Sequence, residues 1–319
     1  MPPRSARLLL ALLTLTAACA GGDDAGIDRA ATTTTAADTT TTPPETTTTT
    51  APDLDPRAAD DPQGLAAQIV HAEGAIADPA TTGDELRAAG RLQQVVYRAL
   101  STRPEWDEAV DAALPEGLRP IARANVDANR ELRSTLRLRD TLPAWRIVEA
   151  APADELRRYY EEGQSLHGVP WEYLAAVHLV ESRMGRLRGI STAGAQGPMQ
   201  FIPSTWDAYG EGDINDNRDA IVSAARYMAA NGGDCREGAP CNLDNALHRY
   251  NPAPTGWYKR AVTAFAERIR ADERAHLGYH EWQVFYATTL GDVWLRIGYE
   301  EPESRAVTEA DVANGAGPR

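Results

Sequence analysis

Apolar residues recur every three to four positions through most of the chain from residue 61 to residue 272. Leu65 and Ile69, for example, fall on one face of a helix, and Asp61 just before them is a favoured N-cap residue. Between residues 61 and 140 no stretch alternates for long with the period of two that a half-buried strand requires. The sequence therefore predicts a mainly α fold.

The expected helices form two blocks. In the first, a small helical region, helices begin at Asp61, near Asp84 and at Thr102, and a further one carries Ile121 to Leu136. In the second block, helices are expected near residues 152–167, 170–183, 203–209, 217–230, 243–250 and 256–272. After Gly278 the apolar period changes to two about Gly291 and Asp292, which predicts a short C-terminal β-hairpin. Its alternating residues are Trp282, Val284, Tyr286, Val293, Leu295 and Ile297.

The first residues have the pattern of an export signal. A short basic stretch precedes an apolar run from Leu8 to Ala18, which is too short to cross a bilayer. The following TAAC resembles a bacterial lipobox, so we expect Cys19 to carry lipid, although Thr16 stands where Leu or Val is usual. The alternative is a plain secreted protein cleaved near Ala18 or Ala20.

The cysteine count agrees with export. If Cys19 is lipidated, Cys235 and Cys241 remain, and an oxidising compartment permits a disulfide between them. Zinc is the alternative for this pair, but no histidine lies at ligand spacing beside it. We therefore expect a disulfide, no metal and no cofactor.

The charge limits the choice of partner. The formal net charge is −14, and removing Arg4 and Arg7 with residues 1–18, which contain no acids, makes it −16. Such a balance disfavours nucleic acid and anionic membrane surfaces as partners and accommodates a neutral or zwitterionic substrate.

A glutamate occupies an apolar position near the end of the helix expected at 170–183. Leu174, Val177 and Glu181 share one stripe of that helix. Burial raises the pKa of a carboxyl group toward the range in which it donates a proton at neutral pH. The competing interpretation is a buried ion pair, since Arg183, Arg186 and Arg188 follow closely.

A glycine-containing segment, STAGAQGPMQFIPSTW, follows at Ser191 to Trp206. Its glycines do not follow an expected strand, so a dinucleotide or phosphate loop is disfavoured. Gly194 and Gly197 allow the backbone to approach a ligand closely, and the adjoining Met199 and Gln200 offer the surface that a sugar ring requires. A plain turn between two helices is the alternative.

Four motifs together resemble a known family. ESRMGR, GAQGPMQF, PSTW and ALHRYN are similar in order and spacing to the lytic murein transglycosylases, which share the goose-type lysozyme fold, over roughly residues 143–270. The resemblance implies that Glu181 is the single catalytic carboxylate and that Ser191 contacts an acetamido sugar. It places Tyr250 over the reacting sugar and implies that Gly197, Met199 and Gln200 line the groove. We also expect Phe201, beside Gln200, and Asn251 of the YN pair to contact the substrate.

The implied reaction cleaves the MurNAc–GlcNAc β-1,4 bond of peptidoglycan without water and leaves 1,6-anhydro-MurNAc ends. The rivals are a lysozyme-like hydrolase, in which Asp207 or Asp213 activates water, and a non-catalytic peptidoglycan-binding lipoprotein. The expected partners are glycan strands, with the membrane reached only through the lipid and no nucleic acid. The protein is expected to act as a monomer, outside the cytoplasm.

The expected organisation of the chain follows from these motifs and from composition. It comprises a signal peptide at 1–19, a disordered Thr/Pro-rich linker at 20–60, a helical N-terminal region at 61–142, a lysozyme-like catalytic domain at 143–274, a hairpin-like extension at 275–300 and a disordered tail at 301–319.

Overall fold

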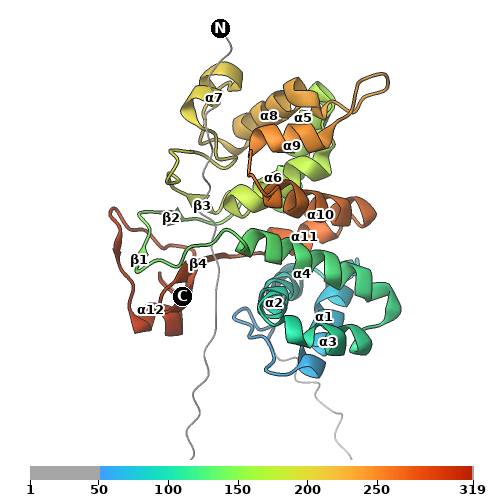
Figure 1. The fold of residues 1–319 in the computed structure, drawn as a ribbon, viewed down its shortest axis with the longest axis vertical. Coiled ribbons are helices and arrows are strands. Elements are labelled where there is room, and N and C mark those ends of the chain that lie inside the picture. Colours follow the sequence, from blue (N-terminus) through green and yellow to red (C-terminus); the bar gives the residue numbers. More distant parts are fainter. Residues whose placement is uncertain (1–50, 318–319) are drawn as a thin grey trace, which may run out of the picture.

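The computed structural model describes residues 51–317, and these residues are mainly helical (Figure 1). The predicted fold class is confirmed, with few and short strands beside the helices. The expected signal peptide, Cys19 and linker residues 20–50 lie outside the described residues. Within residues 51–317, every helix is too short or too polar to cross a membrane.

The first block of helices lies at the lower end of the molecule in Figure 1. It consists of α1 (Pro62–Ala77), α2 (Gly83–Ser101), α3 (Asp107–Ala113) and α4 (Arg119–Arg133), with short 3₁₀ turns at Pro104–Trp106 and Glu116–Leu118. The expected N-cap forms, since the Asp61 side chain accepts a 2.8 Å hydrogen bond from the Gly64 amide. Helix α1 packs on α2, and α4 packs along α10 of the second block.

The second block surrounds one central helix. Its members are α5 (Ala153–His167), α6 (Trp171–Ser182), α7 (Pro203–Tyr209), α8 (Asn217–Met228), a π turn (Ala229–Gly233), α9 (Leu243–Tyr250), α10 (Trp257–Ala271) and α11 (Ala275–His280). Helix α6 contacts α5, α8, α10 and α11. It is consequently buried on almost every side, since all of its residues except Glu172 are buried, and Leu174, Val177 and Glu181 are among them.

Three two-stranded sheets enclose a second, smaller core. The pairs are β1 (Thr141–Leu142) with β6 (Arg305–Ala306), β2 (Arg146–Ile147) with β3 (Leu187–Arg188), and β4 (Val284–Thr288) with β5 (Gly291–Leu295), all antiparallel. The last pair is the expected hairpin. Its turn is at Thr289 and Leu290, because Thr288 pairs with Gly291, and not at Gly291 and Asp292 as the sequence suggested.

The C-terminal segment is folded, which corrects the expectation of a disordered tail at 301–319 for residues 301–317. Arg305 forms two 2.8 Å hydrogen bonds to Asp311. Asp311 and Thr308 form a capping box at the start of α12 (Glu309–Asn314). The polar composition suggested disorder, but these polar groups pair with one another and β6 completes the sheet with β1.

The linker ends earlier than expected, because residues 51–60 are described and several of them contact the folded part. The Gln68 side chain bonds the backbone of Arg57 and Ala59, at 2.8 and 2.9 Å. Arg296 holds the Asp55 carboxylate through contacts of 3.0 and 3.1 Å. The folded part therefore begins about ten residues before the expected boundary at residue 60.

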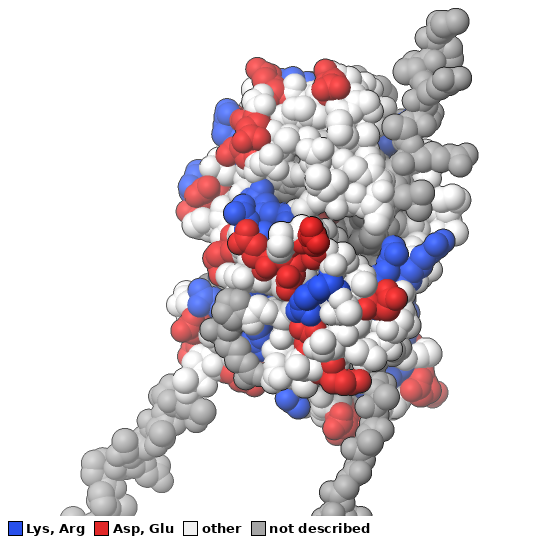
Figure 2. Space-filling view, turned by 90° about the vertical axis from the view of Figure 1, so that its left-hand side faces the viewer, with Lys and Arg blue, Asp and Glu red and all other residues white. Residues whose placement is uncertain are grey.

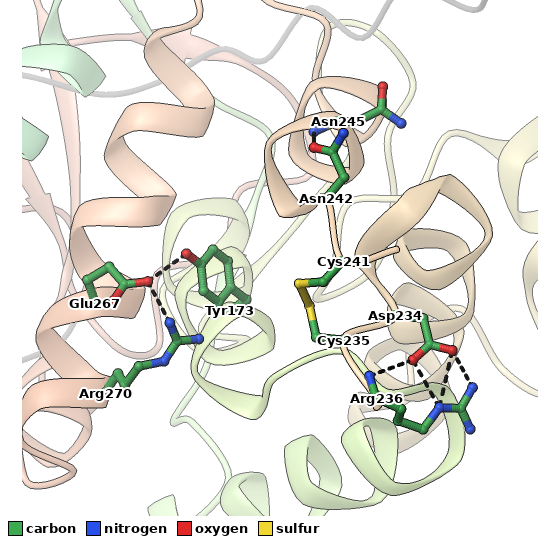
Figure 3. Close-up of a disulfide and its surroundings, with 9 residues drawn as sticks. All are labelled: Tyr173, Asp234, Cys235, Arg236, Cys241, Asn242, Asn245, Glu267 and Arg270. Atoms are coloured by element: carbon green, nitrogen blue, oxygen red, sulfur yellow. Dashed lines mark hydrogen bonds and ion pairs between the residues drawn. A yellow bond between two sulfur atoms is a disulfide. The ribbon is translucent and has the colours of Figure 1, made fainter. Parts of the chain in front are cut away.

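Cys235 and Cys241 form a disulfide between the π turn and α9 (Figure 3). It closes a short loop, with six residues of separation. Asn242 next to it caps α9 by accepting a 3.0 Å hydrogen bond from the Asn245 amide. The Cys235 amide donates to the Gly168 carbonyl at 2.9 Å, so this loop is tied to the end of α5.

Candidate functional site

Glu181 lies in the last turn of α6 and its side chain is almost wholly enclosed. The residue is 5% exposed. Its Oε1 accepts a 2.6 Å hydrogen bond from the hydroxyl of Tyr258 on α10, and its Oε2 is buried without a partner among residues 51–317. A burial of this kind, with one neutral donor, raises the pKa of Glu181 to about 8, and the Tyr258 bond opposes part of that rise.

The nearby arginines do not pair with this carboxyl group. Arg183 donates to the Leu179 carbonyl at 2.6 Å, and Arg188 donates to the Asn215 carbonyl at 2.8 Å. Arg186 is fully buried and donates to the carbonyl of His280. Among the described residues, no cation forms an ion pair with Glu181, so the competing interpretation from the sequence does not apply.

The backbone after Glu181 is strained. Arg183 and Met184 have φ values of 55° and 59°, in the left-handed region that side chains other than glycine rarely adopt. The turn is fixed by Ser182, whose hydroxyl donates to the Pro198 carbonyl at 2.6 Å and accepts from the Gly185 amide at 3.0 Å. The helix end that carries Glu181 is therefore joined to the 191–201 loop.

Within that loop, Ser191 serves as an internal cap and Gly197 permits a close approach. The Ser191 Oγ accepts hydrogen bonds from the Ala193 and Ala195 amides, at 3.2 and 3.0 Å. Gly197 has φ 73°, and a Cβ at this position would lie 1.9 Å from the Ile214 carbonyl oxygen. Only glycine fits here, and the reason is the packing of the loop against the turn before α8.

The side chains of Met199, Gln200 and Phe201 face inward. Met199 is fully buried, and Phe201 packs edge-on against Trp206, with 5.3 Å between ring centroids. The Gln200 Nε2 donates to the Gly197 carbonyl at 2.9 Å. These residues shape the loop from within, whereas the sequence had suggested that they present surface to a sugar.

Tyr250 lies near Glu181 but forms no hydrogen bond to it among the described residues. Its hydroxyl donates to the Met199 carbonyl at 2.7 Å. Its ring is parallel to that of Tyr258 within 4°, with centroids 6.2 Å apart. Asn251, which follows, is 3% exposed and its Nδ2 is buried without a partner among the described residues.

Tyr258 is the site residue that the sequence interpretation missed. It lies 77 positions from Glu181. A signal exists in the sequence, because Tyr258 falls on the apolar face of the helix that begins after Gly256, and a buried tyrosine hydroxyl requires a partner. Nothing in that signal identifies Glu181 as the partner.

Three other titratable groups are less suited to chemistry. His178, one turn before Glu181, is fully buried with Nδ1 2.8 Å from the Tyr160 hydroxyl, and burial lowers its pKa well below the usual value. Asp207 and Asp213 are exposed, and Asp213 accepts a 2.9 Å hydrogen bond from the Asn215 amide. No hydrogen bond connects either aspartate to Glu181 within residues 51–317.

The surface near the loop carries little charge. Residues 189–206 contain no Asp, Glu, Lys or Arg. Figure 2 shows a largely uncharged area in the upper part of the face it presents, and acidic and basic groups gather below it. An uncharged surface suits a neutral ligand such as a glycan.

Comparison with known proteins finds similarity over part of this region. Residues 186–253 match the family described as Transglycosylase SLT domain. The chain contains a transglycosylase SLT domain. A segment of 75 residues is 37% identical to the membrane-bound lytic murein transglycosylase F of Thiobacillus denitrificans, and it covers 24% of this chain and 16% of that protein.

The matched part of the SLT domain includes the 191–201 loop, the disulfide, Tyr250 and Asn251. Glu181 lies five residues before the match and Tyr258 five residues after it. The assignment of these two residues therefore depends on their contacts in the structure.

Proposed function

We propose that this protein is a peptidoglycan lytic transglycosylase that cleaves the MurNAc–GlcNAc β-1,4 bond and leaves 1,6-anhydro-MurNAc ends. The observation that carries the proposal is the state of Glu181, a single buried carboxyl group with one free oxygen and no cation beside it. The SLT domain match and the similarity to a lytic murein transglycosylase of Thiobacillus denitrificans support the same reaction.

The geometry indicates which oxygen holds the proton. Tyr258 donates to Oε1, so the proton of the neutral Glu181 is carried by Oε2, the atom without a protein partner. Because the pKa is raised to about 8, this proton is present at neutral pH. Glu181 is thereby set up as a general acid toward a bound substrate.

In the proposed first step, Glu181 gives its proton to the glycosidic oxygen as the bond from that oxygen to C1 of MurNAc breaks. In the second, the C6 hydroxyl of the same sugar attacks C1 and returns its proton to the Glu181 carboxylate. Bond breaking and bond formation balance, and no water is consumed. A tethered hydroxyl replaces the second carboxylate that hydrolytic glycosidases require, because it has a high effective concentration.

The residues around Glu181 hold it in place in this proposal. Tyr258 fixes the carboxyl orientation, and Tyr250 supports Tyr258 from the side while binding the loop at Met199. We propose that the sugar contacts come from the 191–201 loop, mainly through Ser191 and backbone groups, since Met199, Gln200 and Phe201 are buried.

The test is product analysis by mass spectrometry after digestion of purified sacculi. Anhydro ends 18 Da lighter than reducing ends are expected, because no water is added. Reducing ends alone would identify a lysozyme-like hydrolase. Intact sacculi, with binding retained, would identify a non-catalytic peptidoglycan-binding protein. Glu181→Gln is the matched control for contaminating activity.

We also propose that the protein acts outside the cytoplasm, anchored by lipid on Cys19 and acting as a monomer. The proposal is supported by the sequence of the first 19 residues and by the disulfide, which requires an oxidising compartment. Cys19→Ala should release the protein from the membrane fraction into the medium. Equal membrane retention of the variant and the parent would contradict the anchor.

A further inference from the structure

A cavity of about 500 Å³ lies between the N-terminal helices and the C-terminal hairpin, outside the SLT domain. Helix α2 supplies one wall and β4, β5 and α12 supply the other, while the segment at Asp55–Arg57 borders it. The two walls are joined by reciprocal hydrogen bonds between the Gln94 side chain and the Gln283 backbone, at 2.7 and 2.8 Å. The cavity is thus built on fixed elements.

Three residues that line this cavity have buried polar atoms without a partner among the described residues. These atoms are the Nε of Arg91, the Nε1 of Trp294 and the Oδ1 of Asp292. The Asp292 side chain is 2% exposed, and its other oxygen is paired with Arg98 at 2.8 Å. Native proteins rarely leave such atoms unsatisfied, and here two donors and one acceptor line a single cavity.

The rim of the cavity already binds one carboxylate and one carbonyl of the chain itself. Arg296 holds the Asp55 carboxylate with both of its terminal nitrogens, and Arg91 Nη1 donates to the Leu54 carbonyl at 2.8 Å. Three arginines and two aspartates line the cavity, in a chain whose overall formal charge is −14. The local balance favours a ligand that carries a carboxylate.

Other ligand classes fit less well. A sugar would stack on an aromatic face, but the Trp294 ring already contacts the Arg296 guanidinium at 4.0 Å and the Phe285 ring at 5.8 Å. A phosphate ion offers no cationic group to Asp292 and would be repelled by it. A group with both a carboxylate and an ammonium satisfies the two donors and the acceptor together.

We propose that this cavity binds a free amino acid or a short peptide of a few residues, with its terminal carboxylate and its terminal ammonium group both inside the cavity. The carboxylate accepts hydrogen bonds from Arg91 and Trp294, and the ammonium group donates to Asp292. Small side chains lie against Val95, Val312 and Ala313, the apolar part of the lining. The volume limits the ligand to a few residues. This site is separate from Glu181 and does not depend on the proposed reaction.

The test measures binding of alanyl-alanine to the folded protein by isothermal titration calorimetry, with an increase in melting temperature as a second readout. Free alanine is measured in parallel to separate an amino acid from a peptide as the preferred form. A dipeptide capped at both ends, N-acetyl-alanyl-alanine amide, is the ligand control and should bind at least about tenfold more weakly.

Two variants remove one donor each and preserve much of the side chain. Trp294→Phe deletes Nε1 but keeps an aromatic ring, and Arg91→Lys deletes Nε but keeps the charge. Each is expected to weaken binding and so to raise the dissociation constant by about tenfold. Arg87→Lys, one turn earlier on α2 and outside the lining, is the matched control and should bind as the parent does. Circular dichroism verifies that each variant is folded.

Three outcomes would overturn the proposal. They are no binding of alanine or alanyl-alanine at millimolar concentration, equal binding of the free and the capped dipeptide, and binding unchanged in both folded cavity variants. Glu181→Gln should bind alanyl-alanine normally while it fails to cleave sacculi. That variant separates failure of this proposal from failure of the proposed reaction.

Discussion

Among residues 51–317, two glutamates are buried, one in each block of helices. Glu73 on α1 is 2% exposed and Glu181 on α6 is 5% exposed. Each accepts a hydrogen bond from a buried tyrosine, Tyr97 at 2.7 Å for Glu73 and Tyr258 at 2.6 Å for Glu181. By burial and by residue type the two sites are nearly the same.

They differ in what else surrounds the carboxyl group. Glu73 also accepts from the Gln93 side chain at 3.0 Å and forms an ion pair with Arg268 at 3.5 Å. Both of its oxygens are engaged by groups that favour the charged form, and it joins α1 to α10. Glu181 lacks both the cation and the second donor. The comparison indicates that burial alone does not identify a general acid. Burial of a carboxyl group that has neither an ion pair nor a second hydrogen-bond donor does.

The largest expected effect concerns catalysis. Glu181→Gln removes the proton donor and should lower the rate of sacculus cleavage by about 10² to 10⁴. Glu73→Gln should leave the rate within about threefold of the parent, since Glu73 contacts only groups inside the fold. The rate at which each purified variant releases anhydro-muropeptides from sacculi measures both effects. A Glu181→Gln enzyme with more than about a tenth of the parental rate would remove the distinction between the two sites.

Stability should change in opposite directions for the same two substitutions. Glu73→Gln removes one of two counter-charges of Arg268, which keeps Asp272 at 3.1 Å, so it should lower the free energy of unfolding by less than the roughly 3–5 kcal/mol of a fully broken buried pair. The folded pKa of Glu181 is raised from 4.5 to about 8, so its contribution to stability is full below pH 4.5, falls progressively as the pH rises from 4.5 to about 8, and is absent above that. Glutamine avoids that loss. The free energy of unfolding of the Glu181→Gln variant should therefore exceed that of the parent by about 1–3 kcal/mol at pH 7.5 and equal it near pH 4.

Urea unfolding followed by circular dichroism at pH 4 and pH 7.5 gives these free energies. A Glu181→Gln variant that is less stable than the parent at pH 7.5 would show that groups in the folded protein stabilise the ionised Glu181 carboxylate. A Glu73→Gln variant with parental stability would show that its ion pair with Arg268 contributes nothing.

The pH dependence of the rate separates the two carboxyl groups further. The reaction needs the protonated form of Glu181, which is lost above a pKa of about 8. The value of kcat/KM should fall by about tenfold per pH unit beyond that point. Initial rates of sacculus solubilisation between pH 6 and 10 measure this decline, the alkaline limb of the pH profile, and Glu73→Gln should not shift it. A decline that begins below pH 6 would contradict the proposal that Glu181 is protonated at neutral pH.

The sequence predicted the local structure of the second block closely. The helices expected at 203–209 and near 217–230 form as α7 and α8. Pro203 stands at the first position of α7, and the Asp216 side chain caps α8 by accepting a 3.0 Å hydrogen bond from the Asp219 amide. These signals act over one helical turn, so a single sequence contains them. The short helix α11 and the folded residues 301–317 were missed, because their order depends on pairing with distant segments. The expected division between 142 and 143 stays a prediction.

The candidate site was predictable only in part, for the same reason. Glu181 was found because a charged residue interrupts an apolar helix. Its actual environment depends on Tyr258, which comes from α10, and on arginines that bind carbonyl groups instead of the carboxylate. The direction of a side chain such as Met199 depends on the packing of a loop, which residue type alone does not define. The roles proposed for the loop residues remain predictions.

The smallest expected effects come from the two tyrosines. Tyr258 lowers the pKa of Glu181 by donating to it, so Tyr258→Phe should raise that pKa and move the alkaline limb to higher pH. Loss of orientation should also reduce the rate by about tenfold. Tyr97→Phe removes the equivalent bond to Glu73 and should cost about 1 kcal/mol of stability while the limb and the rate stay unchanged. The position of the limb is the deciding readout, because simple destabilisation lowers the rate without moving it. If Tyr258→Phe leaves the limb in place, the Tyr258 bond does not tune Glu181, and the contrast between the two glutamates depends on the ion pair with Arg268 and the hydrogen bond from Gln93.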